Sequence, residues 1–449
     1  MYRTKVGGLP PTLATIQAGK MIKPIDDLKQ SGRTILKGGT LVDPKNGVEA
    51  VRDVCFCGDR ITEVAENISA EKGDIVINCE GLLVVPGLID MHLHLGDLFE
   101  VSTRTIHCSA EDGVTLGLSP GAGNTFLAPS LLGAEIDRGL PINLGVYLGA
   151  VNVLGTMLSV DELVRLFKGE LEEEIAFEKM SRNRIAYLTG PLVVGIKDHM
   201  GHFLQSDENI DKIYEITSRA NLIYMTHTQD PAHAERMVGL SKGRPIHLAH
   251  ATAPGCGTHM DPVESMNIIV DLVKQENVSA EFVTTMLREG LGSRDGLQID
   301  RRAQQIAKDA LANGLVDVLI SDGQNDATMK GFGDTRDNIP AILELAQEGV
   351  WSLSQSVASM TQKPAELIGK LTKEPWWNEV GHLGVGALAN VTIIDKADKL
   401  ATYVFVNGEL VSFENRSVRR GDGAGAWISK FGAIKNMGIG DLATWSYNL

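Results

Sequence analysis

The sequence lacks the features of several large protein classes. Its 449 residues contain no uncharged apolar run long enough for a transmembrane helix. The first 20 residues, MYRTKVGGLPPTLATIQAGK, lack the apolar core of a signal peptide. Only five cysteines occur, at irregular spacing, which argues against a disulfide framework. We therefore expect a cytoplasmic protein that does not contact a membrane.

Positive charge is also scarce: the sequence has 42 basic and 57 acidic residues, and its formal net charge is −15. Such a surface repels phosphate backbones and anionic lipids, which argues against nucleic-acid partners. Cys55 and Cys57 resemble a metal-binding fragment, but the alternating stretch DVCFCGD indicates a strand instead. What remains is the composition of an ordinary globular protein, with 43% hydrophobic residues.

Short β-like runs occur in two segments that flank the middle of the chain, whereas the first 33 residues have none. Residues 1–33 show no periodicity and are interpreted as an extension, an arm that could reach a partner subunit. Residues 34–86 and 385–449 contain short apolar runs separated by turn residues, and Asn407-Gly408 is a strong hairpin signal. These two segments predict one small β-sandwich built from both chain ends, followed by a C-terminal tail.

The middle of the chain, residues 87–384, alternates short β-branched runs with helical patterns. One helical pattern begins after Ser159, with Glu162 three residues on, as in a capping box. Counting LIDMH as the first strand, the segment holds eight strand–helix units. The sequence therefore predicts an α/β fold, a (β/α)8 TIM-type barrel with the sandwich appended.

Polar residues follow five of the eight apolar runs, and the active site of such a barrel lies at these strand ends. Their residue types suit a metal site, since imidazole and carboxylate bind zinc and similar ions. An ammonium has no lone pair, but a neutral lysine can add carbon dioxide and become an anionic carbamate that bridges two cations. Any one of these residues alone has a structural explanation, whereas the combination favours metal binding. The candidates are His92, His94, Lys197, His227, His250 and Asp322.

Other basic side chains lie on the loops after the fourth, sixth and seventh predicted strands and could hold the carboxylate of a substrate. Arginine fits that role because its planar fork accepts both oxygens, although most loop arginines are simply solvated. The candidate substrate-binding residues are His199, His202, His259, Arg288 and Arg294.

At these residues the chain resembles the amidohydrolase superfamily, from about residue 34 to 415. VVPGLIDMHLHLGD resembles the family's first-strand signature, and GHLGVGALANVTIID resembles its return to the sandwich. The family's usual Gly-x-Asp-Ala-Asp turn is GALAN here, and the loops REGLGSRDG and GQNDATMKGFGD match no substrate signature. The close spacing of His227 and His250 resembles phosphotriesterase and small-acyl deacylase members more than hydantoinases.

The resemblance implies a binuclear centre with two divalent metals, zinc first, with manganese or iron as alternatives. It assigns His92, His94 and Asp322 to one metal and His227 and His250 to the other, bridged by a carbamate on Lys197.

The expected activity is hydrolysis of a C–N amide bond in a small molecule, an N-acyl amino acid or a cyclic amide or ureide. Asp322 would carry the proton from the attacking water to the leaving nitrogen. A deaminase, an esterase, lactonase or phosphotriesterase on the same site, and a non-catalytic scaffold are the alternatives. We also expect a homo-oligomer.

Overall fold

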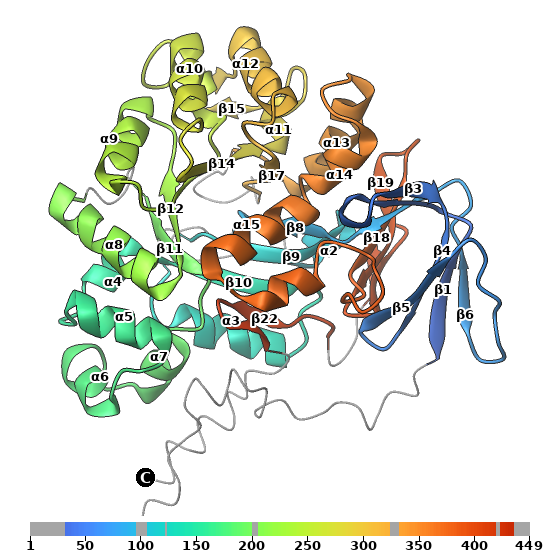
Figure 1. The fold of residues 1–449 in the computed structure, drawn as a ribbon, viewed down its shortest axis with the longest axis horizontal. Helices are drawn as coiled ribbons and strands as arrows, with labels where there is room; N and C mark the ends of the chain where they lie inside the picture. Colours follow the sequence, from blue (N-terminus) through green and yellow to red (C-terminus); the bar gives the residue numbers. More distant parts are fainter. Residues whose placement is uncertain are drawn as a thin grey trace, which may run out of the picture.

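A computed structural model of the chain describes residues 32–95, 106–121, 124–199, 205–323, 332–418 and 423–434. His202, almost all of the expected N-terminal extension and most of the C-terminal tail lie outside these residues. Figure 1 shows a barrel ringed by helices, with two larger sheets beside it on the right. Among the helices of the described residues, none is long and apolar enough to cross a membrane.

The barrel consists of eight parallel strands that neighbour one another in chain order. A parallel bridge between Leu93 and Gly323 links the ends of the first and last strands, so the ring is nearly closed. The predicted (β/α)8 barrel is thereby confirmed. The strands are β8 (Leu88–Asp90), β9 (Val114–Ser119), β10 (Asn143–Gly149), β11 (Gly195–Asp198), β12 (Ile223–His227), β13 (Ile246–Ala249), β14 (Val278–Val283) and β17 (Val318–Ile320).

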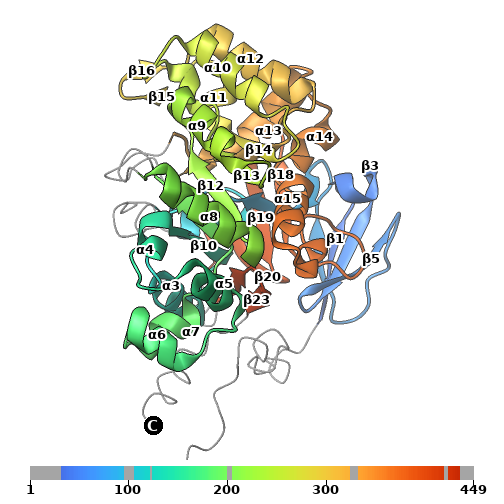
Figure 2. The same ribbon diagram turned by 60° about the vertical axis from the view of Figure 1, so that its left-hand side comes forward.

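Most of the helices cover the outside of this ring, whereas α15 (Gln362–Thr372) lies across the strands at one end of it (Figures 1 and 2). The other helices of the described residues are α2 (Ile106–Glu111), α3 (Ala128–Asp137), α4 (Ala150–Leu154), α5 (Val160–Lys168), α6 (Glu173–Lys179), α7 (Arg184–Thr189), α8 (Asp207–Ala220), α9 (Pro231–Ser241), α10 (Pro262–Leu272), α11 (Thr284–Leu287), α12 (Arg301–Ala312), α13 (Asn338–Gln347) and α14 (Leu353–Ala358). Short 3-10 helices are η2 (Pro44–Asn46), η3 (Ala253–Cys256), η4 (Thr335–Asp337) and η5 (Pro375–Glu379).

The helix predicted after Ser159 begins there, but the segment forms two helices, α5 and α6, in place of one. Ser159 and Glu162 form the capping box at the start of α5. Gly169 ends that helix in the left-handed region, with φ 74°, and α6 follows as a separate helix. A residue in this conformation terminates a helix, and glycine adopts it without strain.

Two further sheets pack face to face outside the barrel. The seven-stranded sheet has the order β21-β20-β19-β18-β7-β2-β3 and the four-stranded sheet the order β5-β4-β1-β6. Phe56 and Phe405 meet edge to face between them, with ring centroids 5.1 Å apart. Strands from both chain ends thus build one core. The first-half strands are β1 (Arg33–Lys37), β2 (Thr40–Asp43), β3 (Val48–Val51), β4 (Asp53–Cys57), β5 (Arg60–Ala65), β6 (Ile75–Asn78) and β7 (Leu83–Pro86).

The second-half strands of these sheets are β18 (Val391–Asp395), β19 (Leu400–Val406), β20 (Glu409–Phe413) and β21 (Arg416–Ser417). Asn407 and Gly408 form the predicted hairpin turn between β19 and β20, with φ values of 50° and 80°. Cys55 and Cys57 are strand residues of β4, as predicted.

After the sandwich the chain returns to the barrel as a hairpin, β22 (Trp427–Ser429) and β23 (Gly432–Ile434). Strand β22 pairs in parallel with the first half of β10. The fully buried indole of Trp427 donates to the carbonyl of Leu192 at 2.8 Å, and the backbone N–H of Lys430 donates to Val193 at 2.8 Å. The hairpin therefore lies near the N-terminal ends of β10 and β11.

Candidate metal centre

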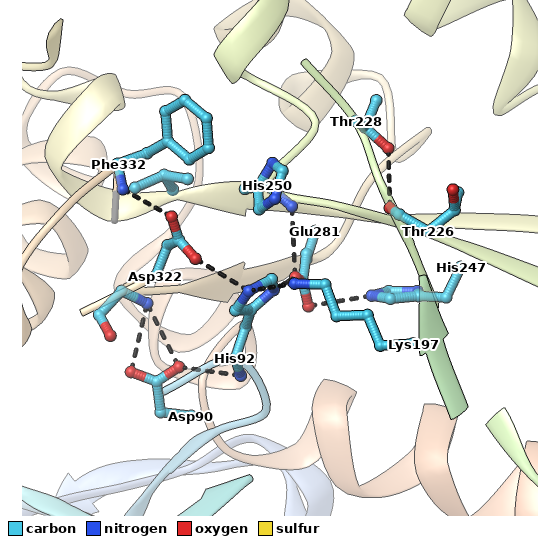
Figure 3. A network of polar contacts seen from close by, with 12 residues as sticks. Asp90, His92, Lys197, Thr226, Thr228, His247, His250, Glu281, Asp322 and Phe332 are labelled. Carbon is cyan, nitrogen blue, oxygen red and sulfur yellow. Dashed lines mark hydrogen bonds and ion pairs between the residues drawn. The ribbon is translucent and has the colours of Figure 1, made fainter. Parts of the chain in front are cut away.

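The strand ends bring the six sequence-predicted ligands to the mouth of the barrel, and Figure 3 shows His92, Lys197, His250 and Asp322 among them. Strand β8 leads to His92 and His94, and β17 leads to Asp322. Strands β11, β12 and β13 supply Lys197, His227 and His250. All are buried except His227, which is partly exposed. The parallel direction of the strands causes this convergence, because every strand delivers its last residues to the same end.

The tightest group is formed by His92, His94 and Asp322, whose possible ligand atoms lie within 4.8 Å of one another. Asp322 Oδ1 lies 2.8 Å from His92 Nε2 and 3.2 Å from His94 Nε2. Lys197 Nζ lies 2.8 Å from His92 Nε2. The carboxylate, the two imidazoles and the amine therefore point at a common space.

His227 and His250, at the ends of β12 and β13, complete the group of candidate ligands. Their ring centroids are 4.6 Å apart, and the His250 ring is 5.1 Å from that of His92. Burial lowers the pKa of both imidazoles well below the usual range, and the charge of Lys197 lowers them further. A neutral imidazole keeps a lone pair for a metal, and His250 Nδ1 is buried with no hydrogen-bond partner among the described residues. This donor set fits divalent metals.

Two of these residues have a strained backbone. His250 and Asp322 lie in the left-handed region, with φ values of 37° and 48°. Such a conformation costs about 1–3 kcal/mol for a residue with a side chain and is concentrated at functional sites. Hydrogen bonds hold both residues in place, from His250 N to Glu281 Oε1 at 3.2 Å and from Phe332 N to Asp322 Oδ2 at 2.6 Å.

The ionisation of Asp322 follows from its surroundings. Burial alone would raise its pKa, but His92 and His250 face the carboxylate, and His92 and His94 bond to it. Together these contacts hold the pKa of Asp322 well below its usual value. The group is therefore an anion at neutral pH.

Sequence reasoning missed the buried acidic groups behind the predicted ligands. Glu281 in β14 is fully buried and bonds to His92 Nδ1, while Asp90 accepts from the backbone N–H groups of His92 and Ser321. Burial raises the pKa of Asp90 to about 6. For Glu281 burial is outweighed by His92 and His247, and the pKa falls to about 2. A single acidic residue inside the apolar run VSAEFV was the available signal.

The histidines predicted to contact substrate lie in different surroundings. His199 is buried, and its ring stacks 6.0 Å from that of His227. His259 is exposed, with its Nδ1 4.0 Å from the carboxylate of Asp230. His199 therefore lies beside the centre, whereas His259 is on the surface.

The two candidate arginines also differ. Arg294, in the short hairpin β15 (Ser293–Arg294) and β16 (Leu297–Gln298), lies over the Phe332 ring at 4.6 Å. That ring is itself 4.6 Å from the ring of His250. Gln229 anchors the hairpin by donating to Asp295 Oδ2 at 3.0 Å. Arg294 is thus held at the mouth of the barrel.

Arg288 is directed elsewhere. Its guanidinium makes a two-point contact with Glu344, at 2.8 and 3.0 Å, and bonds to Asp337. Both carboxylates lie on or beside α13, on the outer layer of the barrel. The donors of Arg288 are therefore engaged with carboxylates on or beside α13, whereas Arg294 lies at the mouth of the barrel.

Comparison with known proteins agrees with this geometry. A sequence model of the amidohydrolase family matches residues 83–411. The chain belongs to the amidohydrolase family. A dihydroorotase of Geobacter sp. (strain M21) is 23% identical over 399 residues, covering 81% of this chain and 89% of that protein. A dihydroorotase of Trichlorobacter lovleyi is 25% identical over 406 residues, with coverage of 81% and 89%.

Solved structures share the fold of this amidohydrolase. The L-hydantoinase (dihydropyrimidinase) from Arthrobacter aurescens superposes with a TM-score of 0.65 at 16% identity, covering 88% of this chain and 99% of that one. These matches are dihydroorotases and hydantoinases, not the phosphotriesterase or deacylase members suggested by the spacing of His227 and His250. The family membership makes the protein a hydrolase.

Proposed function

We propose that this amidohydrolase opens a C–N bond of a small cyclic amide or ureide. The observation that carries the proposal is the convergence of imidazole, carboxylate and lysine side chains from five strand ends on one buried point. The dihydroorotases and hydantoinases to which the chain is similar favour a ring over a linear N-acyl amino acid.

Two divalent metals, zinc first, are the proposed cofactors. His92, His94 and Asp322 would hold one, and His227 and His250 the other. Bound cations of this kind lower the pKa of water and polarise a carbonyl group. The buried Nδ1 of His250, which has no hydrogen-bond partner among the described residues, supports this assignment.

Lys197 is proposed to carry a carbamate that bridges the two metal positions. Its Nζ is buried among imidazoles, 2.8 Å from His92 Nε2, where a positive charge opposes cation binding and an anionic oxygen ligand favours it. We expect Lys197→Ala to lose both metal and activity, with partial rescue by a small added carboxylate. A crystal structure of the active protein that shows an unmodified amine at Lys197 would contradict the carbamate.

Asp322 is the proposed proton carrier. Its Oδ1 faces the metal position while the backbone N–H of Phe332 fixes Oδ2 at 2.6 Å. The carboxylate takes a proton from the attacking water and then delivers it to the ring nitrogen as the C–N bond breaks. An amide nitrogen leaves poorly without that proton, so one residue able to do both suits this bond.

Arg294 is the proposed contact for an anionic group on the substrate. The guanidinium lies over Phe332, whose ring packs against His250, so an anion bound there would be close to the reacting amide. Arginine pairs well with a carboxylate because two of its N–H groups match the two oxygens.

A matched pair of rings tests the substrate class and Arg294 together. Dihydroorotate carries a ring carboxylate, and dihydrouracil has the same ring without it. We expect the first to have the higher kcat/KM, with the preference lost in Arg294→Met and kept in Arg288→Met, the matched control from the same loop. Equal kcat/KM for both rings removes the anion contact, and hydrolysis of only N-acetyl amino acids, lactones or phosphotriesters removes the ring amide.

A further inference from the structure

A buried chain of polar groups lies behind the metal position and has no part in the function proposed above. Glu281 lies in the middle of β14, and His247 lies in the neighbouring strand β13. Neither side chain has any exposed surface. An unpaired buried carboxylate is costly, so its partners identify its role. Among the described residues those partners are the ring of His92, the ring of His247 and the backbone of His250.

Each carboxylate oxygen of Glu281 contacts a different set of these partners. Oε1 bonds to His92 Nδ1 and accepts from the backbone N–H of His250 at 3.2 Å. Oε2 lies 3.0 Å from His247 Nε2, and His247 Nδ1 lies 2.9 Å from Ser279 Oγ. The carboxylate is therefore fixed in orientation by three neighbours from two strands (Figure 3).

The contact with His92 decides which ring nitrogen faces the site. When Nδ1 carries the proton and donates it to Glu281, Nε2 keeps its lone pair and points toward Lys197 and Asp322. A carboxylate behind an imidazole also makes the ring a stronger ligand, and removing such a partner commonly weakens metal binding by about 10–100-fold.

We propose that Glu281, held by His247, is the positioning residue that fixes the tautomer of His92 and strengthens it as a metal ligand. The inference rests on the proposed metal centre, since it requires His92 to be a ligand. It adds to that centre a residue from β14, which supplies none of the predicted ligands.

Glu281→Gln is the informative variant because it removes the charge and little else. The amide oxygen can accept from His92 and His250 as before. The amide nitrogen can donate to His247 Nε2 if the proton of that ring moves to Nδ1, which faces Ser279 Oγ. Packing is therefore preserved while the negative charge behind His92 is lost.

Asp53→Asn is the matched control. Asp53 is also a buried carboxylate with three hydrogen-bond partners, but it lies in β4, outside the barrel. The measurement is the dissociation constant for zinc ions, determined on each full-length protein by competition with a chelator. We expect Glu281→Gln to bind zinc about 10–100-fold more weakly than wild type, and Asp53→Asn to bind it as wild type does.

The proposal is supported if Glu281→Gln weakens zinc binding at least about fivefold more than Asp53→Asn does. A smaller difference between the two variants overturns it. His92→Ala separates the two hypotheses: if that variant retains full zinc affinity, the proposed metal centre fails. If His92→Ala loses zinc and Glu281→Gln does not, only the role of Glu281 fails.

A second measurement needs no variant at Glu281. In protein labelled with ¹⁵N-histidine, the ring of His92 is assigned by its absence from the spectrum of His92→Ala. We expect the metal-free wild type to show His92 protonated at Nδ1, with slow exchange of that proton. Protonation at Nε2 alone would overturn the proposal even if Glu281→Gln does not fold.

Discussion

The two ends of the barrel are built on opposite principles. At the C-terminal end, polar side chains are buried around a shared point, and His250 and Asp322 have strained backbones. Near the N-terminal end, the hairpin β22–β23 places the apolar ring of Trp427 against the loop before β11. The first end therefore carries features that cost stability, whereas the second contributes buried apolar packing.

The largest effect is expected at the mouth, from removal of a ligand. His92→Ala and His250→Ala should each lose at least about one metal equivalent per chain and have no detectable activity, because the ion loses an imidazole ligand. Metal analysis of purified protein and an activity assay check this. Full activity in a metal-free wild type would contradict the metal assignment.

A smaller loss is expected from Asp322→Asn, which keeps the shape of the side chain and removes its ability to accept a proton. We expect kcat to fall by about 10²–10⁴-fold, the usual contribution of general acid–base catalysis, with most of the metal retained. Steady-state kinetics at saturating substrate measures this, and a wild-type kcat would exclude the proton-carrier role.

At the N-terminal end of the barrel, a substitution in the hairpin β22–β23 should lower stability and leave metal binding and catalysis unchanged. Trp427 is fully buried, so Trp427→Ala should lower the free energy of unfolding by about 3–5 kcal/mol. Metal content and kcat per folded molecule should stay at the wild-type level. Denaturant titration and active-site counting test both halves, and a selective loss of metal would show that the two ends are not independent.

The smallest effect concerns Lys430, a buried lysine in the same hairpin whose Nζ donates to the carbonyl of Ala220. Burial lowers its pKa from 10.5 to about 8. Between these two values the unfolded chain binds more protons than the folded one, so stability rises with pH across that window.

The variant Lys430→Met lacks this titration. From pH 8 to 10.5, wild type should gain up to about 3 kcal/mol relative to Lys430→Met, given about 1.36 kcal/mol for each pKa unit. Unfolding curves of both proteins at several pH values measure the difference. Parallel pH dependence of the two proteins would mean that Lys430 titrates normally.

Local sequence patterns determined the barrel and the ring of candidate metal ligands. Apolar runs with polar last residues define strands whose ends meet, because parallel strands share a direction, and this placed His92 and Asp322 together although 230 positions separate them along the chain. The capping box at Ser159 and the turn at Asn407 were likewise readable, since each depends on neighbours a few residues away.

Only the tertiary structure decided which other side chains lie against the candidate ligands. Arg288 and Arg294 occupy the same loop and are similarly exposed, at 21% and 23%, yet one packs against α13 and the other lies over Phe332. Glu281 bonds to His92, which is 189 residues away in the sequence, and the hairpin β22–β23 returns to β10. Such contacts depend on strand order, ring closure and the direction of each loop, and no local periodicity encodes them.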